Sequence, residues 1–210
     1  MKKLITCLCF LVLTFPLFSQ CNIKIYENNS KSFNISIPIF MSSPIYLGNT
    51  HLIKSGAVLS EYNIRQEDDI FSAICGLGPI GLSIGSNIQN TGYAVYGYPL
   101  NIYTNLFGFS IRPLQFTFGN KFDISPVFFY EDVSTSFFDT SKNRIGWNYG
   151  EYRVEELVES SGYNYKTFGL GVSFSLSVFC IELRGCSESF GIYFGIDFCK
   201  AYEKIYNFDF

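Results

Sequence analysis

The sequence predicts an all-β chain that folds into an antiparallel, up-and-down barrel crossing a membrane. Three observations predict it: a short apolar segment at the amino terminus, an apolar alternation of period two, and an alternate face of small uncharged residues. The chain has 210 residues, of which 48% are hydrophobic, 19% aromatic and 16% charged. A disordered chain would carry more charge and fewer aromatics. The formal net charge of −3 lacks the basic surplus of a nucleic-acid binder, so no nucleic-acid partner is expected.

The amino terminus has the organisation of a secretory signal peptide. Lys2 and Lys3 precede an apolar run over residues 4–18, which is shorter than the ~20 residues that a membrane-spanning helix needs. We predict a signal peptide over residues 1–20 and a single domain over residues 21–210. A cut after Gln20 would expose Cys21 for lipidation, although a small residue is expected before a lipidated cysteine.

The cysteines give no sign of a metal site or a disulfide framework. Cys21, Cys75, Cys180, Cys186 and Cys199 remain after the predicted cleavage, and no CxxC or Cys/His ligand spacing occurs. A bridge between Cys180 and Cys186 across a turn is the alternative to free thiols in strands. We predict no disulfide, no metal and no cofactor.

Strands are predicted where large apolar residues alternate with small or polar ones. The pattern is clearest in four segments and shorter or weaker in five others. The clear segments are 33–39, 121–130, 167–178 and 189–198; the others are 55–63, 69–76, 80–84, 93–103 and 107–111. Turn residues lie between most of them.

One connection is much longer than the others. Residues 132–164 are polar and acidic, and the piece 151–159 has a helix-like pattern. Long connections in compact domains are usually functional or flexible. Aromatics among charges are common at contact surfaces, so Trp147, Tyr149 and Tyr152 are the candidate surface-contact residues.

The character of the two faces favours a membrane barrel over a soluble sandwich. The polar face of a soluble sheet carries Lys, Glu, Thr and Arg, whereas the alternate face of residues 167–177 is mostly Gly and Ser. Small residues suit the interior of a narrow barrel, and Phe, Leu, Ile and Val suit lipid. A secreted or lipid-anchored soluble β-sandwich or barrel that binds a small apolar ligand is the alternative.

The carboxyl terminus carries the most specific pattern. Tyr202, Tyr206, Phe208 and Phe210 share one face if the last strand runs from residue 190 to 210, and Lys204 departs from the pattern. This resembles the carboxyl-terminal signature of Gram-negative outer-membrane β-barrel proteins, in particular the small eight-stranded type. The resemblance implies location in the cell outer membrane, with membrane lipid as a partner. It also implies that the barrel-assembly machinery reads Tyr206, Phe208 and Phe210.

About eight strands are predicted, with a range of eight to ten. Treating 69–87 and 190–210 as single strands gives eight, and splitting both gives ten. The eight-strand assignment places the 132–164 connection on the periplasmic side and the ten-strand assignment places it outside. We expect the long connection to be external.

Three sequence features could carry chemistry, and each has a simpler interpretation. Residues 76–81 match G-x-G-x-x-G, but a strand follows where a dinucleotide site needs a helix, so a turn or bend is expected. His51, the single histidine, is expected in a solvated connection, and a lipid-modifying enzyme using it is a remote possibility. The carboxylates of residues 67–69 are expected in a charged turn.

The sequence therefore predicts a non-enzymatic outer-membrane barrel. Its expected role is structural or surface-interacting, with at most a narrow pore because side chains fill the interior of a small barrel. The sequence does not identify an extracellular partner.

Overall fold

The computed structural model describes residues 23–28, 33–38, 43–53, 57–59, 64–65, 67–91, 100–119, 122–139, 156–158 and 164–206. The described residues are almost entirely strand, and a helix follows the last of these strands. The strands are β1 (Ile23–Asn28), β2 (Phe33–Ile37), β3 (Pro44–Leu52), β4 (Ala57–Leu59), β5 (Ile64–Arg65), β6 (Asp69–Leu77), β7 (Ile80–Thr91), β8 (Leu100–Ile111), β9 (Gln115–Phe118), β10 (Phe122–Asp139), β11 (Glu156–Val158), β12 (Tyr165–Leu176), β13 (Phe179–Gly185) and β14 (Ser189–Asp197). The helix is α2 (Phe198–Tyr206). Among the described residues, no helix has the length and apolarity to span a membrane.

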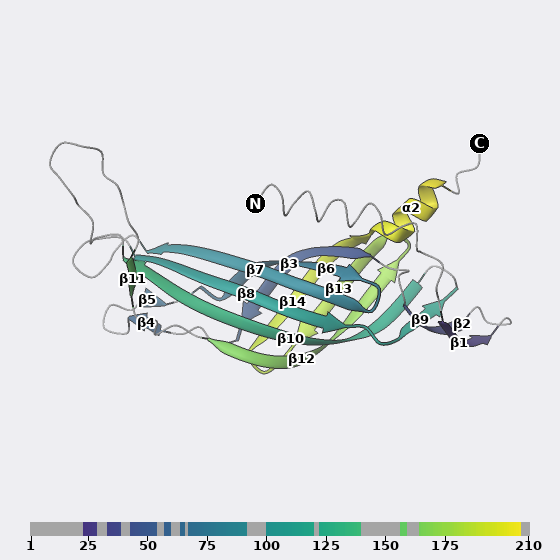
Figure 1. The fold of residues 1–210 in the computed structure, drawn as a ribbon, viewed down its shortest axis with the longest axis horizontal. Helices are drawn as coiled ribbons and strands as arrows, with labels where there is room; N and C mark the ends of the chain where they lie inside the picture. The colour runs from purple at the N-terminus through teal and green to yellow at the C-terminus, as the bar shows by residue number, and fades with distance from the viewer. Residues whose placement is uncertain are drawn as a thin grey trace.

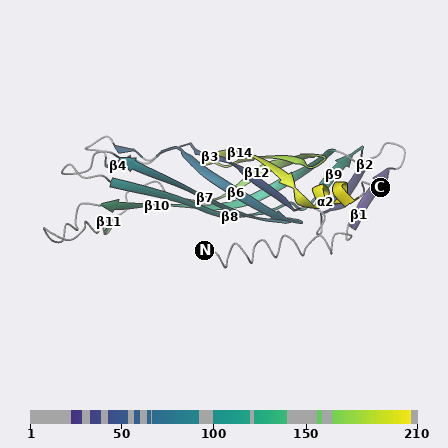
Figure 2. The ribbon, with the colours of Figure 1, turned by 90° about the horizontal axis from the view of Figure 1, so that it is seen from above.

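Eight strands close into an antiparallel barrel, in the order β3, β6, β7, β8, β10, β12, β13, β14. Closure comes from β14 and β3, whose register runs from Ser189 opposite Leu52 to Asp197 opposite Pro44. Both ribbon views place α2, β1, β2 and β9 at one end, here called the α2 end (Figures 1 and 2). They place β4, β5 and β11 at the opposite end, called the far end.

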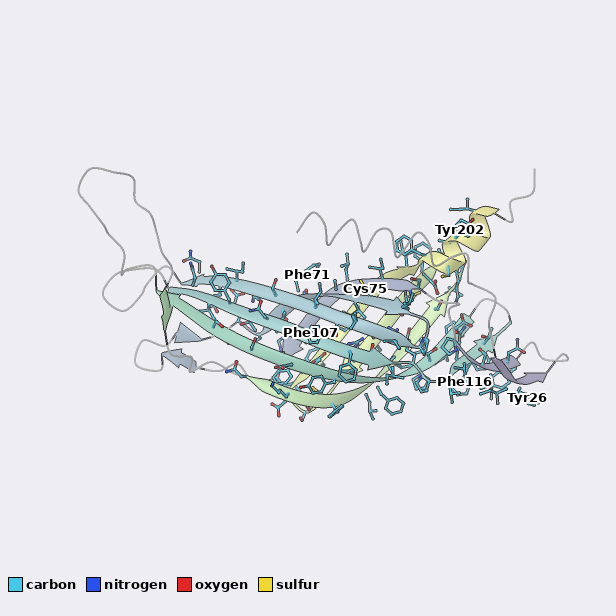
Figure 3. All side chains as sticks on the ribbon, viewed as in Figure 1. Tyr26, Phe71, Cys75, Phe107, Phe116 and Tyr202 are labelled. Atoms are coloured by element: carbon cyan, nitrogen blue, oxygen red, sulfur yellow. The ribbon has the colours of Figure 1, made fainter. Side chains whose placement is uncertain are left out.

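The barrel carries its large apolar side chains on the outside. On β12, Phe168 and Leu170 are 75% and 65% exposed, whereas Ser173 and Ser175 are buried inside. On β14, Phe190, Ile192, Phe194 and Ile196 are likewise exposed. Figure 3 shows such side chains projecting outward from the strands along the barrel. An apolar exterior around a polar interior is the inverse of a soluble fold and is typical of a barrel in lipid.

Short turns join the strands at the α2 end. Gly78 and Pro79 connect β6 to β7, and Gly78 has a φ of 55°, a left-handed conformation that glycine adopts without a steric penalty. Ser177 and Val178 connect β12 to β13. The G-x-G-x-x-G match at 76–81 is therefore a hairpin turn.

Three strands extend the sheet beyond the barrel wall at the α2 end. β8 pairs with β10 over residues 128–139, and β9 pairs with the remaining end of β10 at residues 122–124. β2 pairs with β9, and β1 pairs with β2. The result is a small lateral sheet, here called the β9–β2–β1 extension.

The strand predicted over 190–210 ends at Asp197, and the prediction is wrong beyond that residue. The neighbouring strands offer it no further partner, because Asp197 already lies opposite Pro44, the first residue of β3. The backbone satisfies its own hydrogen bonds as α2 instead. The Asp197 carboxylate accepts from the amides of Cys199 and Lys200 at 3.1 and 3.4 Å, which caps the helix.

Other boundaries also differ from the prediction. Residues 69–87 form two strands rather than one, the predicted strand at 33–39 lies in the extension rather than in the wall, and the segment 55–63 contributes only to the short β4–β5 pair. β3 was not predicted, because Ile45, Tyr46 and Leu47 are apolar in succession and hide the alternation. The predicted number of eight wall strands is confirmed, but some of the segments that form them differ from those predicted.

The long connection begins later than predicted and leaves from the far end. β10 continues to Asp139, and residues 156–158 form β11 against residues 137–139 instead of part of a helix. A strand partner outweighs the weak helical preference of so short a piece. The strands that flank this connection, β10 and β12, place both of its ends away from α2.

The fold is thus an all-β, eight-stranded transmembrane barrel. The predicted signal peptide, residues 1–20, and Cys21 lie outside the described residues.

Candidate functional site in the barrel lumen

Buried charges occupy the lumen. Arg112, Glu131, Glu182 and Arg184 are all less than 5% exposed. Glu182 and Arg184 are two residues apart on β13, so both point inward, and Arg112 follows the end of β8. Isolated charges would be costly to bury, so their partners decide what this interior can do.

Glu182 joins the two arginines. Its Oε2 accepts from Nε and Nη2 of Arg112 at 3.1 and 2.6 Å, and its Oε1 accepts from Nε of Arg184 at 2.6 Å. Arg184 also donates to the hydroxyls of Ser83 and Ser110 at 3.3 and 3.0 Å. This Arg112–Glu182–Arg184 network ties β13 to β7 and β8 across the lumen.

Aromatic rings cover the guanidinium groups. Cζ of Arg184 lies 5.1 Å from the ring centre of Phe129 and 5.7 Å from that of Tyr193. Cζ of Arg112 lies 5.5 Å from the ring centre of Tyr46. Cation–π contacts of this kind stabilise charge away from water. Gly169 faces the Phe129 ring so closely that a side chain there would collide with it.

Glu131 is held by hydroxyl groups. Its Oε2 accepts from Ser189 at 2.9 Å and from Tyr165 at 3.2 Å. Tyr165 belongs to an apolar cluster near the far end, with Leu52, Ile70, Leu106 and Val133. Polar and apolar layers therefore succeed each other along the lumen.

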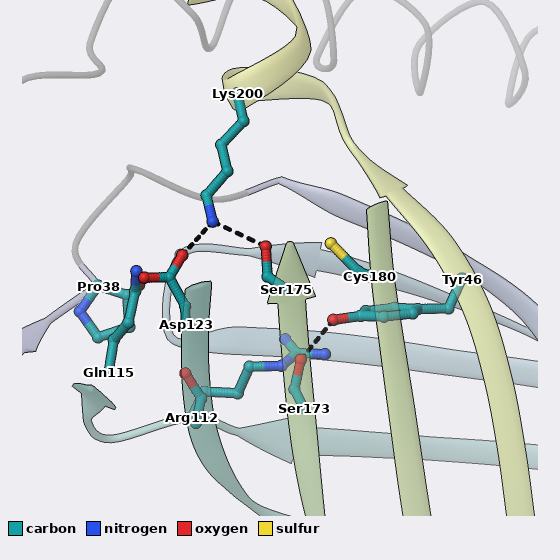
Figure 4. A pocket seen from close by; sticks show the side chains of 11 residues that line it. Pro38, Tyr46, Arg112, Gln115, Asp123, Ser173, Ser175, Cys180 and Lys200 are labelled. Carbon is teal, nitrogen blue, oxygen red and sulfur yellow. Dashed lines mark hydrogen bonds and ion pairs between the residues drawn. The ribbon is translucent and has the colours of Figure 1, made fainter. Parts of the chain in front are cut away.

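A small cavity of about 20 Å³ lies at the mouth of the α2 end (Figure 4). Lys200 of α2 reaches over it, donating to the Asp123 carboxylate and, at 2.7 Å, to the Ser175 hydroxyl. Beneath it, the hydroxyls of Tyr46 and Ser173 share a hydrogen bond of 2.7 Å. Arg112 lines the cavity, and its Nη1 has no hydrogen-bond partner among the described residues. The space suits about one water molecule and is too small for a metabolite.

A larger groove of about 560 Å³ lies towards the far end, where β8, β10 and β12 meet. It has a mixed lining of polar and apolar side chains: Asn105, Leu106, Phe107, Asp132, Val133, Ser134, Asn164, Tyr165 and Lys166. Lys166 and Asp132 pair across the strands at 3.1 Å. The groove adjoins the start of β12, where the long acidic connection ends.

Of the residues singled out for possible chemistry, the structure pairs His51 with Asp69. His51 lies within β3 rather than in a connection, its Nδ1 is 2.9 Å from Oδ1 of Asp69, and its ring is 4.9 Å from that of Phe190. Glu67 accepts from Asn87 at 2.7 Å. Both carboxylates thus have protein partners, and the described residues contain no cluster of three metal-ligating side chains.

The surface-contact candidates Trp147, Tyr149 and Tyr152 lie outside the described residues, as do Phe208 and Phe210. Tyr206 is the last residue of α2. The thiols of Cys75, Cys180 and Cys186 are free.

Sequence reasoning missed the lumen charges, although a signal was present. Residues 179–184 alternate Phe, Ile and Leu with Cys, Glu and Arg, so Glu182 and Arg184 share the inward face of that strand. Charges on the inner face of a membrane strand indicate a paired network.

The comparisons with known proteins give weak similarities. The crystal structure of Ail, the attachment invasion locus protein of Yersinia pestis, matches with a TM-score of 0.34 and 7% identity, over 74% of this chain and 96% of that chain. The crystal structure of Ail in complex with the heparin analogue sucrose octasulfate gives a TM-score of 0.38 and 8% identity over the same shares. No protein-family model and no curated protein matches the chain. The barrel assignment therefore rests on the strand pairings and faces described above.

Proposed function

We propose that the protein is a non-enzymatic barrel of the cell outer membrane, with a closed lumen and a surface-interaction role carried by its far end. The apolar exterior supports the membrane location. β12 has 12 residues and β10 has 18, enough for a tilted β crossing of about 9–11 residues. Closure leaves the wall strands without an open edge in lipid.

The observation that carries this proposal is the Arg112–Glu182–Arg184 network. Both oxygens of Glu182 are engaged, and the guanidinium groups are covered by aromatic rings. A transport channel would keep its charges against water, whereas these are buried and paired with each other. Interaction with partners is then left to the surface.

The alternative of a soluble protein that holds an apolar ligand fits the two faces poorly. A ligand-binding barrel would have an apolar interior and a polar exterior. Here Glu131 and Glu182 are inside, and Phe107, Phe168 and Phe194 are outside.

The far end offers the surface for recognition. The groove beside Asp132 and Lys166 combines polar groups with the exposed ring of Phe107. The acidic connection with Trp147, Tyr149 and Tyr152 departs next to it. We propose that these residues contact an extracellular partner.

Electrophoresis of the membrane-extracted protein, unheated and boiled in SDS, tests the barrel. Closed barrels resist SDS until heated because every wall strand is paired. A heat-dependent shift in mobility is expected. Recovery in the soluble fraction with no shift would contradict the membrane proposal.

Labelling of intact cells tests the surface role. A cysteine in place of Trp147, introduced in a variant whose natural cysteines are serine, is expected to react with a membrane-impermeant maleimide. The matched control is a cysteine in place of Lys204 at the α2 end, which is expected to react only after lysis. The reverse pattern would place the long connection in the periplasm and overturn the surface role.

A further inference from the structure

Five aromatic side chains form a continuous row from the barrel wall to the edge of the β9–β2–β1 extension. We name the row the aromatic ladder: Tyr26, Phe33, Phe118, Phe122 and Phe174. Successive ring centres are 6.2, 5.0, 6.2 and 6.4 Å apart. Tyr26 and Phe118 are 49% and 43% exposed.

The ladder continues the outer face of the barrel. Phe122 lies opposite Phe118, and Phe118 opposite Phe33, so the same side of the sheet passes from the wall into the extension. Ile124, Phe116 and Ile35 follow in the same register on that side. Figure 3 shows Tyr26 and Phe116 on the extension at the α2 end.

The opposite face of the extension continues the polar lumen. Asp123 lies opposite Thr117, which lies opposite Asn34, and Thr117 donates to the Asp123 carboxylate at 2.7 Å. Ser36 and Gln115 pair on the same side. The extension therefore has one apolar and one polar face, as the wall does.

The depth of the extension follows from β10. The outward residues of β10 are apolar from Phe122 to Tyr130, and Asp132 begins the polar part. β9 pairs with residues 122–124, at the α2 end of this apolar stretch. The ladder thus starts within the lipid-facing band and ends at Tyr26, on the outer strand of the extension. A tyrosine side chain combines an apolar ring with a polar hydroxyl, which is favoured at membrane interfaces.

We propose that the aromatic ladder is a lipid-binding surface that seats the extension in the leaflet at the α2 end, with Phe118 among the acyl chains and Tyr26 at the headgroups. This inference rests on the proposed membrane location. Without lipid, a row of apolar rings continuous with the membrane-facing wall would be left against water.

Single-tryptophan fluorescence in lipid vesicles tests the inference. The full chain carries Trp147→Phe, which removes its one natural tryptophan, and one added tryptophan: Tyr26→Trp or Phe118→Trp. Phe194→Trp on the wall and Lys166→Trp at the far end are the matched controls. The vesicles are phosphatidylcholine with acyl chains brominated either near the headgroup or deep in the bilayer. Each variant is first checked for heat-dependent mobility, and Phe33→Trp replaces one that fails.

Lipid bromine is expected to reduce the emission of Phe118→Trp and Tyr26→Trp by about half, with the shallow label more effective for Tyr26→Trp. Phe194→Trp should be quenched by lipid bromine, and Lys166→Trp by aqueous iodide alone. Quenching of Phe194→Trp without quenching of the two ladder variants would overturn the inference and leave the barrel proposal standing. This conclusion is the same whether iodide quenches the ladder variants or a protein surface shields them from it. Failure of lipid bromine to quench Phe194→Trp would overturn the membrane location itself.

Discussion

Glu182 shows how one side chain can hold the lumen together. It is fully buried and accepts from both Arg112 and Arg184, so its removal would leave two buried guanidinium groups without their counter-charge. Removing one partner of a buried ion pair lowers the free energy of unfolding strongly, because the other charge stays buried without a partner. Replacing the whole pair by apolar residues costs much less. The network therefore acts as a unit.

Glu182→Gln is expected to lower the free energy of unfolding by about 3–5 kcal/mol. Urea titration of the refolded protein in detergent micelles, followed by mobility in unheated SDS gels, measures it. Asp132→Asn is the control, because it breaks the exposed pair with Lys166 and should cost at most about 1 kcal/mol. Equal effects of the two substitutions would contradict the role assigned to Glu182.

α2 shows where the sequence pattern stops predicting structure. The alternation that continues after Phe190 predicts β14 and its outward face correctly. Beyond Asp197, Phe198, Tyr202 and Ile205 are spaced as on one face of a helix, and the period of two breaks at Lys200 and Lys204. The segment forms a helix because it lacks a strand partner. A local sequence pattern does not show which strands, distant in the sequence, will pair.

Local alternation predicts which face of a strand is apolar, but it does not predict which strands pair. Alternation predicted the barrel and the faces of residues 167–178 and 189–197, because the solvent on each side fixes residue type. It did not predict that residues 33–37 leave the wall, which depends on their pairing with β9. In the lumen, Glu182 and Arg184 could have been placed on the inner face, whereas the contact of Arg112 with Glu182 depends on the barrel's curvature.

Lys200 fastens α2 to the barrel through Asp123 and Ser175. Lys200→Met is expected to speed hydrogen exchange of the α2 amides by about tenfold, since a charged hydrogen bond contributes about 1.5–3 kcal/mol. Mass spectrometry of the α2 peptide in detergent measures it. Lys204→Met, at an exposed position, should leave the rate unchanged. A fast rate in the parent protein would show that α2 is not fastened.

The chain end can be tested separately from the barrel. Deletion of residues 207–210 removes Phe208 and Phe210 but no residue of the eight wall strands. We expect the shortened chain to refold in detergent with its heat-dependent mobility shift intact. In a Gram-negative host we expect less of it in the outer membrane than of the full chain. Equal amounts would contradict the assembly role predicted for Phe208 and Phe210.

As a whole molecule, the barrel has two different ends. The α2 end carries the helix, the small cavity beneath Lys200 and the aromatic ladder, and the far end carries the groove. Between them, the charge network and the cluster around Leu52 and Ile70 occupy the lumen, which we propose to be closed.

The blocked lumen is expected to pass no ions. In planar bilayers the refolded protein should give no stepwise currents at concentrations where a porin, added as control, conducts. Protein recovered from the bilayer should still show the heat-dependent shift. Regular unitary currents from the parent chain would contradict the closed lumen.

The closure of β14 on β3 also sets the order in which the chain can fold. Ser43 donates its amide to the Asp197 carboxylate across a sequence separation of 154 residues. Such distant contacts form slowly, because the entropy of closing the loop is lost before any contact is gained. Hairpins such as β6–β7 and β12–β13 can assemble early, but the ring is incomplete until β14 is in place. A chain that stops before Ser189 would leave the edges of β3 and β13 unpaired, and unpaired strand edges favour aggregation.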